Sequence, residues 1–184
     1  MNLPFFTIGH STRSIEELVE LLQAAEVNLV ADVRTVPKSR TNPQFNKTAL
    51  PDALAQYQIG YEHIAALGGL RGKSRDHSEL NGFWQNQSFR NYADYALSAE
   101  FRAGLDYLIA SGRSRHCAVM CSEAVWWRCH RRIIADYLIA CGEMVFHLMG
   151  RDRIEPARIS NGAVVRSDRT IVYPAGTAEE SSPS

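Results

Sequence analysis

The stretch His-Cys-Ala-Val-Met-Cys at residues 116–121 is an almost unbroken apolar run, and together with the segment after it this run decides the fold. The loop Ser-Glu-Ala-Val at residues 122–125 leads into a helical pattern over residues 126–140, which stops at Gly142. A second apolar run occupies residues 144–149. Two apolar runs joined by a helix predict a βαβ unit with parallel strands. Because both runs are apolar throughout, helices are expected to cover both faces of the sheet.

The same alternation continues toward the N-terminus. Residues 5–9 and 28–33 are predicted strands, and a helix that begins at the capping box of Ser14 and Glu17 lies between them. The remaining predicted elements are a short helix before Gly60, a weak strand at residues 61–64 and a helical stretch over residues 89–109 that breaks near Ser98. We therefore expect a single α/β domain with a mainly parallel sheet flanked by helices.

The texture of the sequence changes at Arg151. Residues 157–165 contain Asn161-Gly162, a dipeptide typical of hairpin turns, and residues 170–173 predict one more strand. We interpret residues 1–150 as the α/β domain and residues 151–174 as a small C-terminal β appendage of the same domain. Residues 175–184 are small and polar, which predicts a disordered tail.

Length and composition bound the class of protein. The 184 residues fit one domain, and a hydrophobic content of 45% excludes a disordered chain. Lys+Arg and Asp+Glu cancel at 20 each, so no overall field attracts nucleic acid or anionic lipid. No stretch is long and apolar enough for a membrane span, and the N-terminus does not read as a signal peptide. With four cysteines, too few for a secreted disulfide framework, the sequence predicts a cytoplasmic protein without membrane partners.

Polar residues gather where the predicted strands end. They are His10 and Ser11, Asp32 and Arg34, Tyr61 and His63, and Cys121, Ser122 and Glu123. Open parallel sheets bind ligands in the crevice outside the carboxyl ends of their strands. We therefore expect one polar cleft at this edge, the alternative being that strand ends are polar simply because they leave the core.

The segment from Cys121 to Arg131 is the densest in polar residues. Backbone N–H groups at a helix start attract anions, and the same field lowers the pKa of a nearby thiol. Cys121 is therefore the candidate nucleophile or redox thiol, with a structural role as the alternative. The spacing from Cys121 to Arg128 is Cys-x6-Arg, whereas phosphatase and rhodanese loops need Cys-x5-Arg, which argues against that chemistry.

Helical periodicity orients the residues of the predicted helix. Extrapolated from a sheet-facing stripe of Ile134, Leu138 and Cys141, it places His130 near that stripe and Cys129 well away from it. His130 is then an acid/base partner for Cys121 or for substrate, the alternative being a packed, hydrogen-bonded histidine. It also places Arg132 and Asp136 on the outer, solvated face.

The spacing of the cysteines does not favour a metal cofactor. Cys117 and Cys141 are expected to be buried, apolar-like thiols. Cys121, Cys129 and His130 could approach one another, but a zinc site would need a fourth ligand such as His10 or His63, and no Cys-x2-Cys pair exists. We therefore predict no cofactor.

Two loops carry local positive charge. Residues 36–40 and 67–75 hold five basic residues and three glycines, which suits a phosphate or a nucleic-acid backbone. Neither loop matches the Gly-x4-Gly-Lys-Ser/Thr phosphate motif, and solvated loops are the plain alternative.

Five short motifs occur in one order along the chain: Thr7-Ile-Gly-His-Ser11, Asp32-Val-Arg34, Leu67-Gly-Gly69, Cys121-x-Glu123 and Cys129-His-Arg131. Together they resemble the domain of unknown function 488 family over about residues 5–150. The resemblance implies a shared site that comprises His10, Ser11, Asp32, Arg34, Cys121, Glu123, Cys129, His130 and Arg131. It implies no particular reaction.

These observations favour an enzyme that acts on a small anionic substrate carrying phosphate or a nucleotide. A thiol-dependent reaction is one option for such an enzyme. The expected catalytic residues are Cys121, His130, His10, Glu123 and Asp32. The expected substrate-binding residues are Ser11, Arg34, Arg131, Arg128 and Cys129. The alternatives are a nucleic-acid-binding or processing module and a regulatory domain that binds a ligand without turnover.

Overall fold

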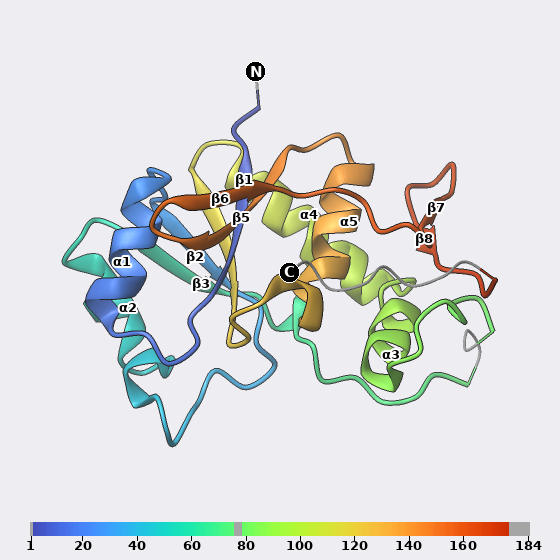
Figure 1. Cartoon of the computed structure of the whole chain (residues 1–184), viewed down its shortest axis with the longest axis horizontal. Coiled ribbons are helices and arrows are strands. Elements are labelled where there is room, and N and C mark those ends of the chain that lie inside the picture. Colours follow the sequence, from blue (N-terminus) through green and yellow to red (C-terminus); the bar gives the residue numbers. More distant parts are fainter. Residues whose placement is uncertain (1, 76–78, 177–184) are drawn as a thin grey trace.

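Six strands form one sheet in the order β3-β2-β4-β1-β5-β6, in which all neighbours are parallel except the antiparallel pair β5 and β6. The computed structural model describes residues 2–75 and 79–176 (Figure 1). The strands are β1 (Phe5–Gly9), β2 (Leu29–Asp32), β3 (Gly60–His63), β4 (Cys117–Cys121), β5 (Val145–Gly150) and β6 (Arg153–Pro156). A separate antiparallel pair, β7 (Val164–Val165) and β8 (Ile171–Val172), lies beyond them in the chain. The predicted α/β class with a small C-terminal β element is confirmed.

Helices cover both faces of the sheet, as the apolar strands predict (Figure 1). The α-helices are α1 (Ile15–Ala24), α2 (Leu50–Ala55), α3 (Gln87–Tyr95), α4 (Ala99–Gly112) and α5 (Arg131–Ala140). Three short 3-10 turns are η1 (Pro43–Phe45), η2 (Ala65–Leu67) and η3 (Trp126–Arg128). The predicted break near Ser98 is confirmed, because its side chain caps α4 by accepting from the backbone N–H of Phe101.

Two apolar cores flank the sheet. One contains α1 and α2 and the other contains α4 and α5. Successive strand residues point to opposite faces, so Ala118 and Met120 pack on the α1 side while Val119 and Cys121 pack on the α5 side. This alternation aims Cys121 at the segment that leads into α5.

The strand register brings the predicted strand ends together. Gly9 pairs with Cys121, and Asp32 pairs with His63. His10 continues the pattern, since its N–H donates to the carbonyl of Cys121 at 2.9 Å. The polar residues after these strands therefore leave the sheet at one edge.

The helix predicted over residues 126–140 is shorter than expected. Residues 126–128 form η3, Cys129 is extended with φ −125° and ψ 145°, and α5 begins only at Arg131. Periodicity extrapolated back from α5 therefore does not reach Cys129, and the predicted direction of that side chain was wrong. Cys141 comes directly after α5 and is only half-buried, unlike Cys117, which is fully buried as expected.

The outer face predicted for Arg132 and Asp136 was also wrong. Both side chains are buried, because the C-terminal segment crosses that face of α5. Ser160 donates its backbone N–H to Asp136 at 2.9 Å, and the Tyr173 hydroxyl donates to the same carboxylate at 2.8 Å. These contacts attach the C-terminal β element to the main domain.

The C-terminal hairpin does not turn at Asn161-Gly162. That dipeptide forms a turn ahead of β7, and the hairpin turn lies between β7 and β8, where Arg166 donates to Thr170 and Arg169 has a φ of 66°. Most of the tail predicted to be disordered, residues 177–184, lies outside the described residues. Across the described part of the chain, no helix combines the length and apolarity that crossing a membrane requires.

Candidate functional site

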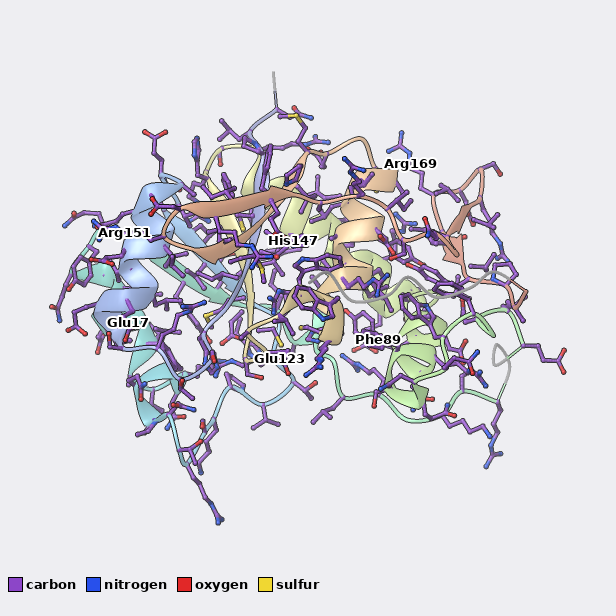
Figure 2. All side chains as sticks on the ribbon, in the orientation of Figure 1. Glu17, Phe89, Glu123, His147, Arg151 and Arg169 are labelled. Atoms are coloured by element: carbon purple, nitrogen blue, oxygen red, sulfur yellow. The ribbon has the colours of Figure 1, made fainter. Side chains whose placement is uncertain are left out.

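A cavity of about 810 Å³ opens at the edge of the sheet where β1, β2 and β4 end. The predicted site residues that line it are His10, Ser11, Arg34, Cys121, Glu123, Arg128, Cys129 and His130. Glu123 and Phe89, labelled in Figure 2, reach it from the loop after β4 and from α3. Asp32 and Arg131 do not line it. The cavity brings His10, Arg34, Cys121 and His130 together, whereas Asp32, which was expected in the same cleft, lies outside its lining.

Asp32 lies behind the cavity wall and fixes Arg34. The carboxylate is fully buried and accepts from Arg34 Nε at 2.9 Å and Nη2 at 2.7 Å. Tyr61 on β3 donates its hydroxyl to the same carboxylate at 2.5 Å. Arg34 Nη2 also donates to the carbonyl of Phe45 at 2.6 Å. A guanidinium held at so many points loses little conformational freedom when it binds a ligand.

His10 lies beside this guanidinium in one defined tautomer. Its Nδ1 is 2.9 Å from the carbonyl of Ser11, which can only accept, so Nδ1 carries the proton. Nε2 is then free to accept from Arg34 Nη1 at 3.2 Å. The ring stacks on Phe45 at 4.3 Å. Burial lowers the pKa of His10, and the positive charge of Arg34 acts in the same direction. Ser11 adopts a left-handed φ of 49°, which is uncommon for a serine.

Cys121, Cys129 and His130 form a sulfur–imidazole cluster on the cavity wall. His130 Nδ1 is 3.8 Å from Cys121 Sγ and 3.6 Å from Cys129 Sγ. The pKa of the Cys121 thiol is lowered, because the neighbouring Cys129 thiol and then His130 favour the thiolate form. Burial raises the pKa of Cys129, and the neighbouring Cys121 sulfur raises it further. The helix start predicted to act on Cys121 acts on Cys129 instead, since the Arg131 N–H donates to Cys129 Sγ at 3.4 Å.

The His130 ring is held from its other side. Nε2 is 2.9 Å from the carbonyl of Val33, so Nε2 carries a proton and Nδ1 is the nitrogen that faces the two sulfurs. The ring meets Tyr92 edge-on at 4.9 Å. Gly69 packs so closely that a Cβ there would lie 2.5 Å from Nδ1. The predicted Leu67-Gly-Gly69 motif thus supports the cluster.

Arg131 shapes the loop after β4 rather than the cavity. Its side chain is fully buried and donates to the carbonyl of Glu123 at 2.5 Å and to that of Ala124 at 3.1 Å. The loop also packs on Gly9, where a Cβ would lie 1.8 Å from the Glu123 carbonyl oxygen. This buried position assigns Arg131 to the loop, where it positions Glu123.

Several residues that line the cavity were not predicted from the sequence. They are Thr12, Thr35, Thr41, Asn42, Asn86, Ser88 and Phe89. Of the two basic loops, the first contributes Lys38 to the cavity, but Arg71 of the second stacks over Tyr95 instead. The start of α3 was missed because nothing local shows that it folds against the cavity. Its one signal is Asn86, which caps α3 by accepting from the N–H groups of Ser88 and Phe89.

Comparison with known families supports the resemblance drawn from the five motifs. The family described as Domain of unknown function DUF488 matches residues 14–138. The chain belongs to this family. The match includes Arg34, Cys121, Cys129 and His130, whereas the motif with His10 precedes it. No curated protein and no solved structure matches the chain.

Proposed function

We propose that the cavity is the active site of an enzyme that acts on a small anionic substrate bearing phosphate, such as a nucleotide. The observation that carries this proposal is Arg34, a buried guanidinium that is fixed by Asp32 and opens onto the same cavity as the sulfur–imidazole cluster. A preorganised cation next to reactive groups stabilises negative charge on a substrate more effectively than a mobile surface cation.

The charges around the cavity support an anionic ligand. Lys38 and Arg128 contribute positive charge, and Arg34 adds a guanidinium whose charge is balanced by Asp32 behind the wall, against a single lining carboxylate, Glu123. Hydroxyl groups of Ser11 and Ser122 add hydrogen-bond donors near the ends of β1 and β4. In this proposal the cations and hydroxyls bind the phosphate, Glu123 moves protons on the reacting part of the substrate, and His10, whose two ring nitrogens contact Ser11 and Arg34, holds the guanidinium in place.

The size of the cavity favours a small molecule over nucleic acid. Its volume of about 810 Å³ falls in the range of about 300–1,000 Å³ that is typical of small-molecule sites. Acidic and basic residues are equal in number, so the protein has no net positive charge that would attract nucleic acid. A mononucleotide or sugar phosphate fits these two features best.

The sulfur–imidazole cluster supplies the reacting group in this proposal. A sulfur beside an imidazole and a second thiol suits a nucleophilic or redox thiol, the role predicted for Cys121. The same three atoms also suit a metal ion. Asp32 and Arg131 act through Arg34 and the Glu123 loop, so they are positioning residues.

The test combines binding with turnover. A pool of nucleoside monophosphates and sugar phosphates is incubated with the full chain and followed by ³¹P NMR, and calorimetry measures binding of each compound that broadens or disappears. We expect at least one compound to be consumed. Lys38→Gln and Arg128→Gln are each expected to weaken its binding about 5–10-fold, since each removes one exposed charge from the cavity.

Arg40→Gln is the matched control, because Arg40 is exposed in the same loop as Lys38 but does not line the cavity. Its affinity should equal that of the unmodified protein. Equal binding of phosphorylated and unphosphorylated nucleosides would refute the anionic substrate. Binding without consumption would indicate a regulatory domain instead of an enzyme. Tight binding only to oligonucleotides would indicate a nucleic-acid-binding module.

A further inference from the structure

The sulfur–imidazole cluster has the dimensions of a metal site. The ligand atoms of Cys121, Cys129 and His130 all lie within 4.8 Å of one another. Zinc binds sulfur at about 2.3 Å and imidazole nitrogen at about 2.0–2.1 Å, so tetrahedral angles place those two atoms about 3.6 Å apart. The observed separations from Nδ1 to the two sulfurs are 3.6 and 3.8 Å. Only small movements would bring the three atoms around one ion.

The orientation of His130 is that of a metal ligand. Its Nε2–H donates to the carbonyl of Val33, which leaves Nδ1 as the nitrogen that faces both sulfurs and can bind a metal ion. Histidines that bind metals usually donate their other ring N–H to a carbonyl or carboxylate in this way. Tyr92 and Gly69 hold the ring from the sides, so Nδ1 keeps its direction without a ligand.

The two sulfurs are surrounded by donors that favour thiolates. The backbone N–H of Arg131 donates to Cys129 Sγ, and the backbone of Glu123 hydrogen-bonds to Cys121 Sγ. Two thiolates and one imidazole are soft and borderline ligands, a set that selects zinc over magnesium or calcium. Both cysteines are buried, which protects such a site from bulk water.

We propose that Cys121, Cys129 and His130 bind one zinc ion, or a similar divalent transition metal, with its fourth coordination position open to the cavity. Among the described residues, only these three side chains form such a group, so the protein supplies three ligands. All three line the cavity. Structural zinc sites have four protein ligands, whereas catalytic sites have three and leave one position for water or substrate. The expected fourth ligand, His10 or His63, is therefore not needed.

This inference goes beyond the proposed function and does not rest on the identity of the substrate. A metal ion at this place would lie in the same cavity as Arg34 and Glu123. There it could polarise a substrate oxygen or lower the pKa of a bound water. Metal binding can be measured without any substrate, so failure of the phosphate-ester test leaves this proposal untouched, and the reverse also holds.

The experiment measures metal content and ligand type on the full chain. Protein purified with a reducing agent is analysed for zinc, then stripped with a chelator and titrated with Co²⁺. We expect one zinc ion per chain, and on titration the visible bands of tetrahedral cobalt together with a thiolate-to-cobalt charge-transfer band. X-ray absorption at the zinc edge should show two sulfur ligands and one imidazole nitrogen.

Cys121→Ser and Cys129→Ser are each expected to weaken metal binding by more than about 100-fold, because each removes a ligand. Cys141→Ser is the matched control, since Cys141 lies outside the cluster and should leave the cobalt spectrum unchanged. An octahedral cobalt spectrum, or full zinc content in Cys129→Ser, would overturn the proposal. A disulfide between Cys121 and Cys129 in freshly reduced protein would also overturn it. The absorption measurement uses only the unmodified chain, so the proposal stays testable if a variant fails to fold.

Discussion

His130 donates from Nε2 to the carbonyl of Val33 at 2.9 Å, across 97 positions of the chain. This contact connects the end of β2 with the start of α5 and fixes which nitrogen of His130 faces the two cysteines. Parallel strands allow it, because the ends of β2 and β4 reach the same edge of the sheet. The chemistry of the cluster therefore depends on a backbone carbonyl that no side-chain motif reveals.

Gly69→Ala is expected to destabilise the protein by about 1–3 kcal/mol. The new Cβ would lie 2.5 Å from His130 Nδ1, so the imidazole or the loop must move. Urea unfolding gives the free energy, and the histidine NMR signals report the ring. Gly72→Ala is the control in the same loop, since a Cβ there meets nothing within 4 Å, and its stability should stay within about 0.5 kcal/mol. Equal stability of the two variants would contradict the tight packing on His130.

Alanine variants of Arg128 and Arg131 are expected to differ in effect: the first weakens ligand binding and the second lowers stability. Arg131→Ala leaves the carbonyls of Glu123 and Ala124 without their donor inside the protein, which should cost about 2–4 kcal/mol in unfolding free energy. Arg128→Ala removes an exposed side chain and should change stability by less than about 0.5 kcal/mol while weakening phosphate-ester binding several-fold. Chemical unfolding and calorimetry measure the two effects. The assignment of Arg131 to the loop fails if its alanine variant is as stable as the unmodified chain.

Tyr61→Phe is expected to reduce the unfolding free energy by about 1–2 kcal/mol. The change removes a hydroxyl that donates to the buried carboxylate of Asp32, while the contacts between Asp32 and Arg34 remain. Tyr107→Phe serves as the control, because that side chain is 52% exposed. Thermal and urea unfolding compare the two. A loss for Tyr107→Phe as large as that for Tyr61→Phe would show that the effect is not specific to Asp32.

The sheet and the shared cavity could be predicted because they follow from local patterns. Buried parallel strands are continuous apolar runs, so β1, β2 and β4 are visible in the sequence. Their polar ends must then share an edge, which is why His10, Arg34 and Cys121 were expected in one place and are found there.

The direction of Cys129 could not be predicted, because helical periodicity applies only within a helix. Cys129 is extended between η3 and α5, and this single residue turns its sulfur toward Cys121 and His130. Arg131 escaped for a different reason. An arginine in a polar segment normally suggests a ligand, whereas this one binds carbonyls of a loop whose path is set by close packing on Gly9.

The burial of Asp136 could not be predicted from helical periodicity either, and it makes stability depend on pH. Its carboxylate is covered by the C-terminal segment, which contributes the donors Ser160 and Tyr173, and Arg132 lies nearby. Burial raises the pKa of Asp136 to about 6, although these donors and Arg132 act in the opposite direction. In the unfolded chain the carboxyl has its ordinary pKa of about 3.9. The folded protein therefore holds this proton over a pH range in which the unfolded chain has released it.

Lowering the pH from 7 to 5 is expected to stabilise the unmodified protein relative to Asp136→Asn by about 1–1.5 kcal/mol. The sign arises because a folded pKa above the unfolded one makes folding take up a proton, so this contribution grows as pH falls below about 6 and is absent above it. Other groups titrate as well, including His147, whose pKa burial lowers to about 3, so the difference between the two proteins isolates Asp136. Urea unfolding at several pH values measures this difference, and Asp152→Asn, at an exposed site, should track the unmodified protein within about 0.5 kcal/mol. A difference between Asp136→Asn and the unmodified protein that stays constant from pH 7 to 5 would show that Asp136 is ionised throughout, and that its burial is compensated by Arg132 and its hydrogen-bond donors.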